Sequence, residues 1–309
     1  MAKSQNTFKS HDNTEIVYFK HLPEAEKKAV VIITHGMAEH AQRYDDFANF
    51  LNQNGFVVYA HDQRGHGKTA GSIDNLGFFA EENGWQKVAN DLGELVKLAK
   101  AENPNLPVFL LGHSMGSFIT RTYIIENSDK VDGVILSGTA GSAGLLGKIG
   151  LLITNIIMMF NPKNTPSPLL DKLSFGDFNK PFKPNRTKFD WLSRDEKQVD
   201  KYVEDPYCGT VFSVGFFNDM MKGLELVNKK ETANKVRKDL PIYLFSGSKD
   251  PVSKNGKQVK DVFEMYKNAN ISDVSMKLYE DARHEMLNET NNKEVYNDVL
   301  EWLNSKLIS

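Results

Sequence analysis

The stretch Pro107-Val108-Phe109-Leu110-Leu111-Gly112-His113-Ser114-Met115-Gly116 decides the expected fold of this chain. An apolar run leads directly into a serine flanked by glycines, and residues 117–124 then have the composition of a helix. A sharp strand-to-helix turn needs small residues around its tip, because the strand and the helix pass close to it. The stretch therefore predicts a nucleophile elbow with Ser114 at its tip. The alternative is a glycine-punctuated loop whose serine only caps a helix.

The composition excludes several classes of protein. With 309 residues the chain can bury a substantial core, and its 38 basic side chains nearly balance 40 acidic ones, so nothing indicates nucleic-acid binding. Cys208 is the only cysteine, which rules out an internal disulfide and fits a reducing compartment. The first residues lack the apolar stretch of a secretory signal, and the most apolar segment, 151–160, is too short to span a bilayer. We expect a cytoplasmic protein without a transmembrane helix.

Short apolar strands alternate with longer helical patterns in most of the chain, which is typical of an α/β fold with a mostly parallel central sheet flanked by helices. A hairpin is expected around residues 11–13. The predicted strands are 30–34, 56–60, 108–111, 134–137, 242–246 and 274–279, and the predicted helices are 44–54, 85–102, 254–268 and 294–307.

The alternation stops after Gly138 and resumes at Leu240. The intervening part contains a glycine-interrupted apolar stretch, several prolines, and helical patterns at 193–202 and 210–228. We interpret residues 140–237 as a helical cap inserted between late strands of the sheet, with residues 1–139 and 238–309 forming the core.

Ser114 would need a general base, and the base would need an orienting acid. Asp250 follows the predicted strand 242–246, and His284 follows the strand 274–279, so both lie at carboxyl ends of strands and in the chain order serine, acid, histidine. Asp239 and Asp281 are rival acids, but one precedes its strand and the other is too close to the histidine. The expected catalytic residues are Ser114, Asp250 and His284.

A tetrahedral intermediate also needs donors for its oxyanion. The backbone N–H of Met115 follows the nucleophile, and that of Met37 lies in the loop His35-Gly36-Met37-Ala38-Glu39-His40 after the first buried strand. We expect these two groups to form the oxyanion hole.

Several motifs together resemble the monoacylglycerol lipase and lysophospholipase-like branch of the α/β-hydrolases, which is grouped under a serine aminopeptidase S33 label. They are residues 35–40 with Arg43-Tyr44, residues 62–69, 112–116 and 246–252, and Arg283-His284-Glu285. The resemblance implies the same triad and oxyanion amides, no cofactor, and a cap with an apolar acyl channel. The first loop departs from the family's usual His-Gly-Ala-Gly-Glu-His at Met37 and Ala38.

The cap segment 145–160 is apolar on nearly every side of a helix, so more than one of its faces should be covered. Burial against the core and contact with an acyl chain or a lipid interface are both open explanations. The candidate substrate-contacting residues are His113, Ile149, Ile153 and Met158.

The expected function is hydrolysis of carboxylic esters with one apolar acyl chain, most simply monoacylglycerol. A lysophospholipase, an esterase or peptidase for smaller or aryl substrates, and a silent binding protein on a hydrolase scaffold are the alternatives. His61, Asp62 and His66 match no familiar zinc spacing, and we expect them to support their loop. No metal is predicted. We expect Cys208 to serve only in packing. The oligomeric state stays open.

Overall fold

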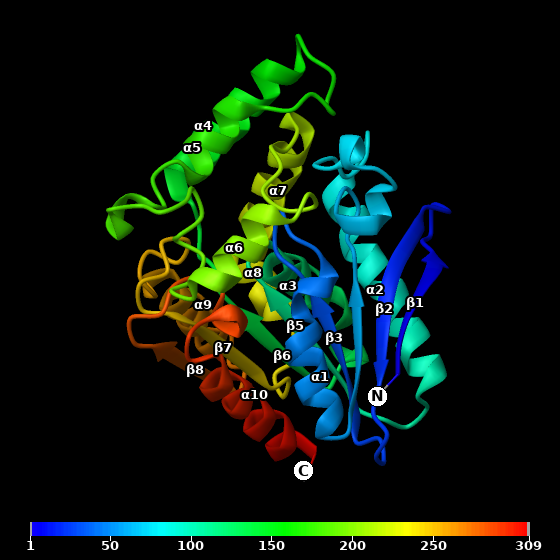
Figure 1. The fold of residues 1–309 in the computed structure, drawn as a ribbon. Helices are drawn as coiled ribbons and strands as arrows, with labels where there is room; N and C mark the ends of the chain where they lie inside the picture. Colours follow the sequence, from blue (N-terminus) through cyan, green and yellow to red (C-terminus); the bar gives the residue numbers. More distant parts are fainter. Residues whose placement is uncertain (1, 308–309) are drawn as a thin grey trace.

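The computed structural model describes residues 2–307. Its centre is an eight-stranded sheet in the order β1-β2-β4-β3-β5-β6-β7-β8 (Figure 1). The strands are β1 (Ala2–Lys9), β2 (Glu15–Leu22), β3 (Ala29–Thr34), β4 (Phe56–His61), β5 (Val108–His113), β6 (Gly133–Ser137), β7 (Ile242–Gly247) and β8 (Val274–Tyr279). β1 and β2 pair as the expected antiparallel hairpin, β2 is antiparallel to β4, and the other neighbouring pairs are parallel. The mostly parallel sheet is confirmed.

The sheet is covered on both faces, which explains its continuous apolar strands. Every residue of β3 and β4 is buried, and so is every residue of β5, β6 and β7. Side chains alternate between the faces: Val30 and Ile32 pack in the core with α2 (Gly84–Glu102), α3 (Met115–Asn127) and α9 (Lys257–Asn268), whereas Val31 and Ile33 pack with α1 (Asp45–Gln53) and α10 (Asn292–Leu307).

Two of the helix starts predicted for the core come too early. The helix expected from residue 254 begins at Lys257, because Lys254, Asn255 and Gly256 have φ angles of 52°, 57° and 81°, which no right-handed helix can contain. The helix expected from residue 44 begins at Asp45, since Tyr44 ends a short 3₁₀ turn, Ala41–Tyr44.

Five α-helices lie between β6 and β7, where the sequence loses its alternation. They are α4 (Gly144–Met158), α5 (Pro168–Phe175), α6 (Glu196–Glu204), α7 (Val214–Val227) and α8 (Lys230–Lys235). Both predicted starts in this region come too early, because Asp195 and Ser213 are N-caps whose side chains accept from the first turns of α6 and α7. In Figure 1, α4 and α5 form the layer farthest from the sheet, with α7 beneath α4. A helical cap is therefore inserted between β6 and β7.

The apolar helix α4 packs through one face only. Gly150 lies against Met221 of α7, and the hydroxyl of Thr154 accepts a hydrogen bond from Asn218 Nδ2 at 2.8 Å. Apolar side chains on the rest of its surface are exposed, namely Leu145, Leu146, Ile149, Leu152 and Ile156, and so are Met159 and Phe160 directly after it. The expectation that more than one face is covered is therefore wrong for the folded chain alone. Within residues 2–307, none of the helices combines the length and hydropathy that crossing a bilayer requires.

Arg121 of α3 binds two parts of the cap that are far apart in the sequence. Its guanidinium is buried and donates to the carbonyl oxygens of Ala140 and Val227, each at 2.9 Å, and to Asn228 Oδ1 at 2.8 Å. Ala140 lies just after β6, and Val227 ends α7. The helix that follows Ser114 is thus also the anchor of the cap.

Candidate active site

Ser114 lies at the sharp turn that the sequence predicts. β5 ends at His113, α3 begins at Met115, and Ser114 between them has φ 50° and ψ −120°. The turn is held by Ser114 N–H, which donates to Ser137 O at 2.9 Å. A Cβ atom at Gly116 would overlap the carbonyl oxygens of Thr34 and His35, so only glycine fits there.

Asp250 and His284 meet at the carboxyl ends of β7 and β8. His284 Nδ1 and Asp250 Oδ1 lie 3.0 Å apart, and both side chains are buried. Asp250 also accepts from Ser246 Oγ at 2.6 Å and from the N–H of Val252 at 2.9 Å. These bonds hold the carboxylate in one orientation.

The electrostatics of this pair favour its charged form. Burial lowers the pKa of His284, but the charge and the hydrogen bond of Asp250 outweigh it, so the pKa lies above the ordinary 6.5. Burial conversely raises the pKa of Asp250, and His284 with the other donors brings it below 3.8. Asp250 is therefore a carboxylate at neutral pH and stabilises an imidazolium at His284.

His284 also lies close to the elbow. Its ring centroid is 4.7 Å from that of His113, which precedes Ser114, and a Cβ at Gly138 would lie 2.9 Å from His284 Cε1. The hydrogen bonds of residues 2–307 do not include one from Ser114 Oγ to His284. Such bonds are often long in ligand-free sites and tighten in the complex with substrate.

The loop after β3 approaches the serine from the other side. A Cβ at Gly36 would lie 3.2 Å from Ser114 Cβ, so Met37 follows directly after the closest approach. Met115 is the first residue of α3, and the N–H groups of a first helical turn have no partner inside the helix. Both candidate oxyanion donors thus belong to segments that border Ser114.

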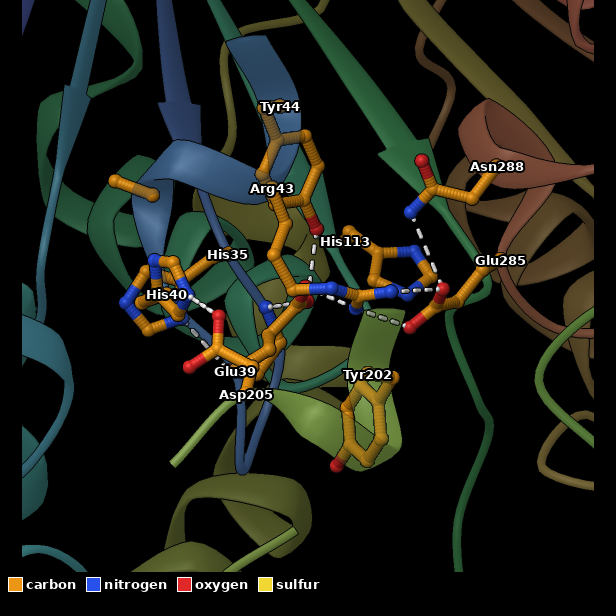
Figure 2. Close-up of polar contacts among 12 residues, drawn as sticks. His35, Glu39, His40, Arg43, Tyr44, His113, Tyr202, Asp205, Glu285 and Asn288 are labelled. Atoms are coloured by element: carbon orange, nitrogen blue, oxygen red, sulfur yellow. Dashed lines mark hydrogen bonds and ion pairs between the residues drawn. The ribbon is translucent and has the colours of Figure 1, made fainter. Parts of the chain in front are cut away.

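A buried ion cluster, which the sequence analysis did not foresee, joins this loop to the histidine loop (Figure 2). Glu39 accepts from Gly36 N–H at 2.6 Å and from Tyr44 Oη at 2.8 Å. Arg43 donates to Glu39 at 2.9 Å and forms a two-pronged ion pair with Glu285, in which Nη2 and Oε2 are 2.7 Å apart. Glu39 and Arg43 are four positions apart, and this spacing is a sequence signal for their ion pair. Nothing in the sequence indicates that Glu285 joins them, apart from its place next to His284.

The cap completes the surroundings of the site. The ring of Trp191 lies 5.3 Å from that of His284, and the Tyr202 ring lies 4.8 Å from the Arg43 guanidinium carbon. Gly209 N–H donates to Ala38 O at 3.0 Å, which ties the cap to the loop after β3. Trp191 and Tyr202 carried no sequence signal, because only the packing of the cap brings them here.

The four candidate substrate-contacting residues lie in different places. His113 is buried, and its Nδ1 lies 3.0 Å from Ser137 Oγ. Burial lowers the pKa of His113 to about 3, which keeps it neutral. Ile149 is exposed on α4, whereas Ile153 and Met158 are partly buried against the core.

His61, Asp62 and His66, which match no familiar zinc spacing, are all buried in the interior. His66 Nδ1 lies 2.9 Å from Arg64 O, and its ring packs against Phe212. Asp62 accepts from the N–H groups of Ala41 and Lys68, each at 2.8 Å. Burial lowers the pKa values of His61 and His66 to about 4. These contacts are those of loop support.

Comparisons with known proteins agree with this geometry. The family described as serine aminopeptidase, S33, matches residues 25–291. The chain is 28% identical to the monoglyceride lipase homolog of Monkeypox virus, over 97% of this chain and 98% of that protein. It is also 28% identical to the monoacylglycerol lipase of Mycolicibacterium smegmatis, over 99% of both.

Among solved structures, the chain is similar to a thermostable carboxyl esterase from Bacillus coagulans in complex with glycerol. The TM-score is 0.91 at 29% identity, over 99% of each chain. A soluble variant of the Saccharomyces cerevisiae monoglyceride lipase shares the fold, with a TM-score of 0.78 at 22% identity, over 99% of this chain and 95% of that one. The chain therefore belongs to the serine aminopeptidase S33 family, has the α/β-hydrolase fold and is a hydrolase of the esterase and lipase class.

Proposed function

We propose that this chain hydrolyses carboxylic esters with a single apolar acyl chain, with monoacylglycerol as the leading substrate, through Ser114, His284 and Asp250. The observation that carries the proposal is the buried His284–Asp250 pair beside a serine held in an elbow. The proposal is also supported by relatives that match over nearly their whole length and are named a monoglyceride lipase homolog and a monoacylglycerol lipase.

In the proposed mechanism, His284 Nε2 removes the proton of Ser114 Oγ as the oxygen attacks the ester carbonyl. Asp250 holds the opposite nitrogen, Nδ1, which selects the tautomer that leaves Nε2 free to accept. His284 then protonates the leaving alcohol and an acyl-enzyme forms. Water activated by the same imidazole releases the acid and restores Ser114.

The oxyanion of each tetrahedral intermediate is bound by the N–H groups of Met37 and Met115. Glu39 supports this role, because its bond to Gly36 N–H holds the loop at the residue before Met37. A single oxyanion donor contributes about 2.7–4 kcal/mol to transition-state stabilisation in a related kind of site. Since backbone groups act, the side chains of Met37 and Met115 are free to shape the acyl pocket.

The exposed face of α4 fits a lipid substrate. Leu145, Leu146 and Leu152 of α4, and Met159 and Phe160 directly after it, are all at least 60% exposed, so the folded chain leaves an apolar surface on the cap uncovered. Lys148 is the one charged residue of α4. We propose that this face touches a lipid interface transiently while a single-chain ester enters beneath the cap.

The test of the chemistry is covalent labelling together with a substrate panel. Fluorophosphonate should add one equivalent to the wild-type chain and none to Ser114→Ala, while the control Ser142→Ala, an exposed serine at the start of the cap, should label normally. Wild-type turnover by Ser114→Ala would refute the triad. On mono-, di- and triacylglycerols, lysophospholipids, aryl esters and aminoacyl amides, we expect a preference for monoacylglycerols with medium or long chains. Equal rates on acetate and medium-chain esters would refute the lipid substrate.

A further inference from the structure

Three metal-ligating side chains meet at the contact between the cap and the loop after β3. The imidazole of His40, the carboxylate of Asp205 and the thiol of Cys208 each offer a ligand atom, and these atoms all lie within 4.8 Å of one another. His40 belongs to the loop after β3, whereas Asp205 and Cys208 lie in the cap between α6 and α7. Figure 2 shows His40 and Asp205 side by side at the edge of the ion cluster.

The three side chains are held in place by other contacts. Asp205 Oδ1 accepts from Tyr207 N–H at 2.8 Å, which directs Oδ2 toward His40 Nε2, also at 2.8 Å. Cys208 N–H donates to Asp205 O at 3.0 Å, so the two ligands belong to one tight turn. The next residue, Gly209, bonds to Ala38 and fixes this turn against the loop that carries His40. Hydrogen bonds to groups outside the coordination shell orient metal ligands in this way.

The charges around the cluster favour a cation. Burial has the largest effect on the Cys208 thiol. Among the charges that act on it, the guanidinium of Arg43 has the largest single effect, and the carboxylates of Asp205, Glu39 and Glu285 together carry three negative charges against that one positive charge. His40 is buried, and Asp205 and Cys208 are partly buried, so solvent screens these charges only in part. A divalent cation bound here would offset the formal excess of two negative charges.

We propose that His40, Asp205 and Cys208 bind a zinc-like divalent cation that joins the cap to the loop after β3. One nitrogen, one oxygen and one sulfur form a donor set that Zn²⁺ and Cd²⁺ accept and that Mg²⁺ and Ca²⁺ do not favour. Tetrahedral bonds to Zn²⁺ place ligand atoms about 3.3–3.8 Å apart, so His40 and Asp205 would separate slightly and Cys208 would approach. As the Sγ–metal bond forms, the thiol proton leaves to solvent. Water would fill the fourth position.

This site is distinct from the proposed triad, and its position predicts a mechanical effect. The cation would link the cap turn 205–208 to the segment that carries Met37, so the cap and the candidate oxyanion loop would move as one body. Because the cation binds the folded chain, it should raise the thermal unfolding temperature.

The test is a spectroscopic titration of the untagged full chain with Cd²⁺ alone. Cys208 is the only cysteine, so every thiolate-to-metal charge-transfer band reports on this one residue. We expect a saturable band with one equivalent of Cd²⁺, its displacement by Zn²⁺, and a higher unfolding temperature. Absence of a saturable band, or a band that saturates without any change in unfolding temperature, would overturn the proposal. The readout is independent of ester hydrolysis, so the metal site can be supported or refuted separately from the proposed function.

Single variants assign the ligands. Cys208→Ser should abolish the band, and His40→Gln and Asp205→Asn should each weaken Cd²⁺ binding by at least about tenfold. The matched control is His21→Gln, because His21 is a buried histidine that also faces a carboxylate, Asp45, at 3.3 Å, but has no thiol beside it. Unchanged affinity in both His40→Gln and Asp205→Asn would show adventitious binding to a thiol and refute the site. Should either variant fail to fold, X-ray absorption of the zinc-loaded wild-type chain decides, since the site requires one sulfur and one imidazole nitrogen in the coordination shell.

Discussion

The guanidinium of Arg43 forms a two-pronged ion pair with the carboxylate of Glu285, the residue that follows His284. Arg43 also binds Glu39, whose carboxylate holds the N–H of Gly36 in the candidate oxyanion loop. The side chain of Arg43 therefore connects the segment that carries the proposed general base to the segment that carries a proposed oxyanion donor. Both parts of the reaction must be held within a fraction of an ångström of their productive positions, and this pair is placed to do so.

Glu285→Gln should lower kcat by about 10- to 100-fold with a smaller change in KM, because the histidine loop loses its fixed position while the substrate pocket remains. Initial rates on a p-nitrophenyl ester, together with fluorophosphonate labelling rates, measure this. The control is Glu294→Gln, because Glu294 is exposed and lies away from the site, where its carboxylate accepts from Lys277 Nζ at 2.9 Å. A kcat equal to that of the wild type would show that the ion pair only stabilises the fold.

Arg43→Gln should destabilise the chain more than Glu285→Gln does. Loss of the guanidinium leaves two buried carboxylates without a counter-ion, whereas loss of Glu285 still leaves Arg43 paired with Glu39. Breaking a buried charge network in this way costs about 3–5 kcal/mol of unfolding free energy. Urea unfolding of the two variants gives the comparison, and equal stabilities would contradict it.

The pH dependence of turnover should report the pKa of His284. Only the neutral imidazole accepts the serine proton, and Asp250 raises the pKa of His284 above 6.5, so kcat/KM should rise with pH through a midpoint above that value. In Asp250→Asn the raising influence is removed and burial still lowers the pKa, so the midpoint should move to lower pH while kcat falls by up to about 10⁴-fold. Rates that stay flat down to pH ~5 would contradict His284 as the base.

Arg121→Lys should loosen the attachment of the cap. A lysine cannot reach the carbonyls of Ala140 and Val227 together, and each buried acceptor left unpaired costs about 1–3 kcal/mol. We expect a lower unfolding free energy and faster proteolysis within residues 140–237. Arg237→Lys is the matched control, because Arg237 also donates to two carbonyls, Ser128 O and Val131 O, but is partly exposed. Equal protection of the cap in both variants would refute the anchoring role.

Leu146→Gln combined with Leu152→Gln should reduce binding to phospholipid vesicles by at least about tenfold. Both side chains are exposed on α4, so the change should leave the unfolding temperature and the hydrolysis of a soluble short-chain ester unaffected. Vesicle sedimentation measures the binding, with Ile73→Gln, an exposed apolar residue outside the cap, as the control. Undiminished sedimentation of the double variant would exclude α4 as the lipid-contacting face.

Local sequence determined the central sheet and the elbow, because both depend on short-range rules. Buried parallel strands need continuous apolar runs such as those of β3 and β5, and the elbow needs glycine where Gly116 passes Thr34 and His35. Chain order alone was enough to predict that Asp250 and His284 would meet, since carboxyl ends of parallel strands share one edge of the sheet.

Tertiary structure alone decided what the cap covers and how charges are paired. The apolar pattern of α4 left burial and exposure equally possible, and only its packing on α7 through Gly150 shows that most of the helix surface is free. The pairing of Arg43 with Glu285 joins residues 242 positions apart, and that of His40 with Asp205 joins residues 165 positions apart. Contacts between such distant segments depend on how the whole chain folds, and no periodicity of the sequence encodes them.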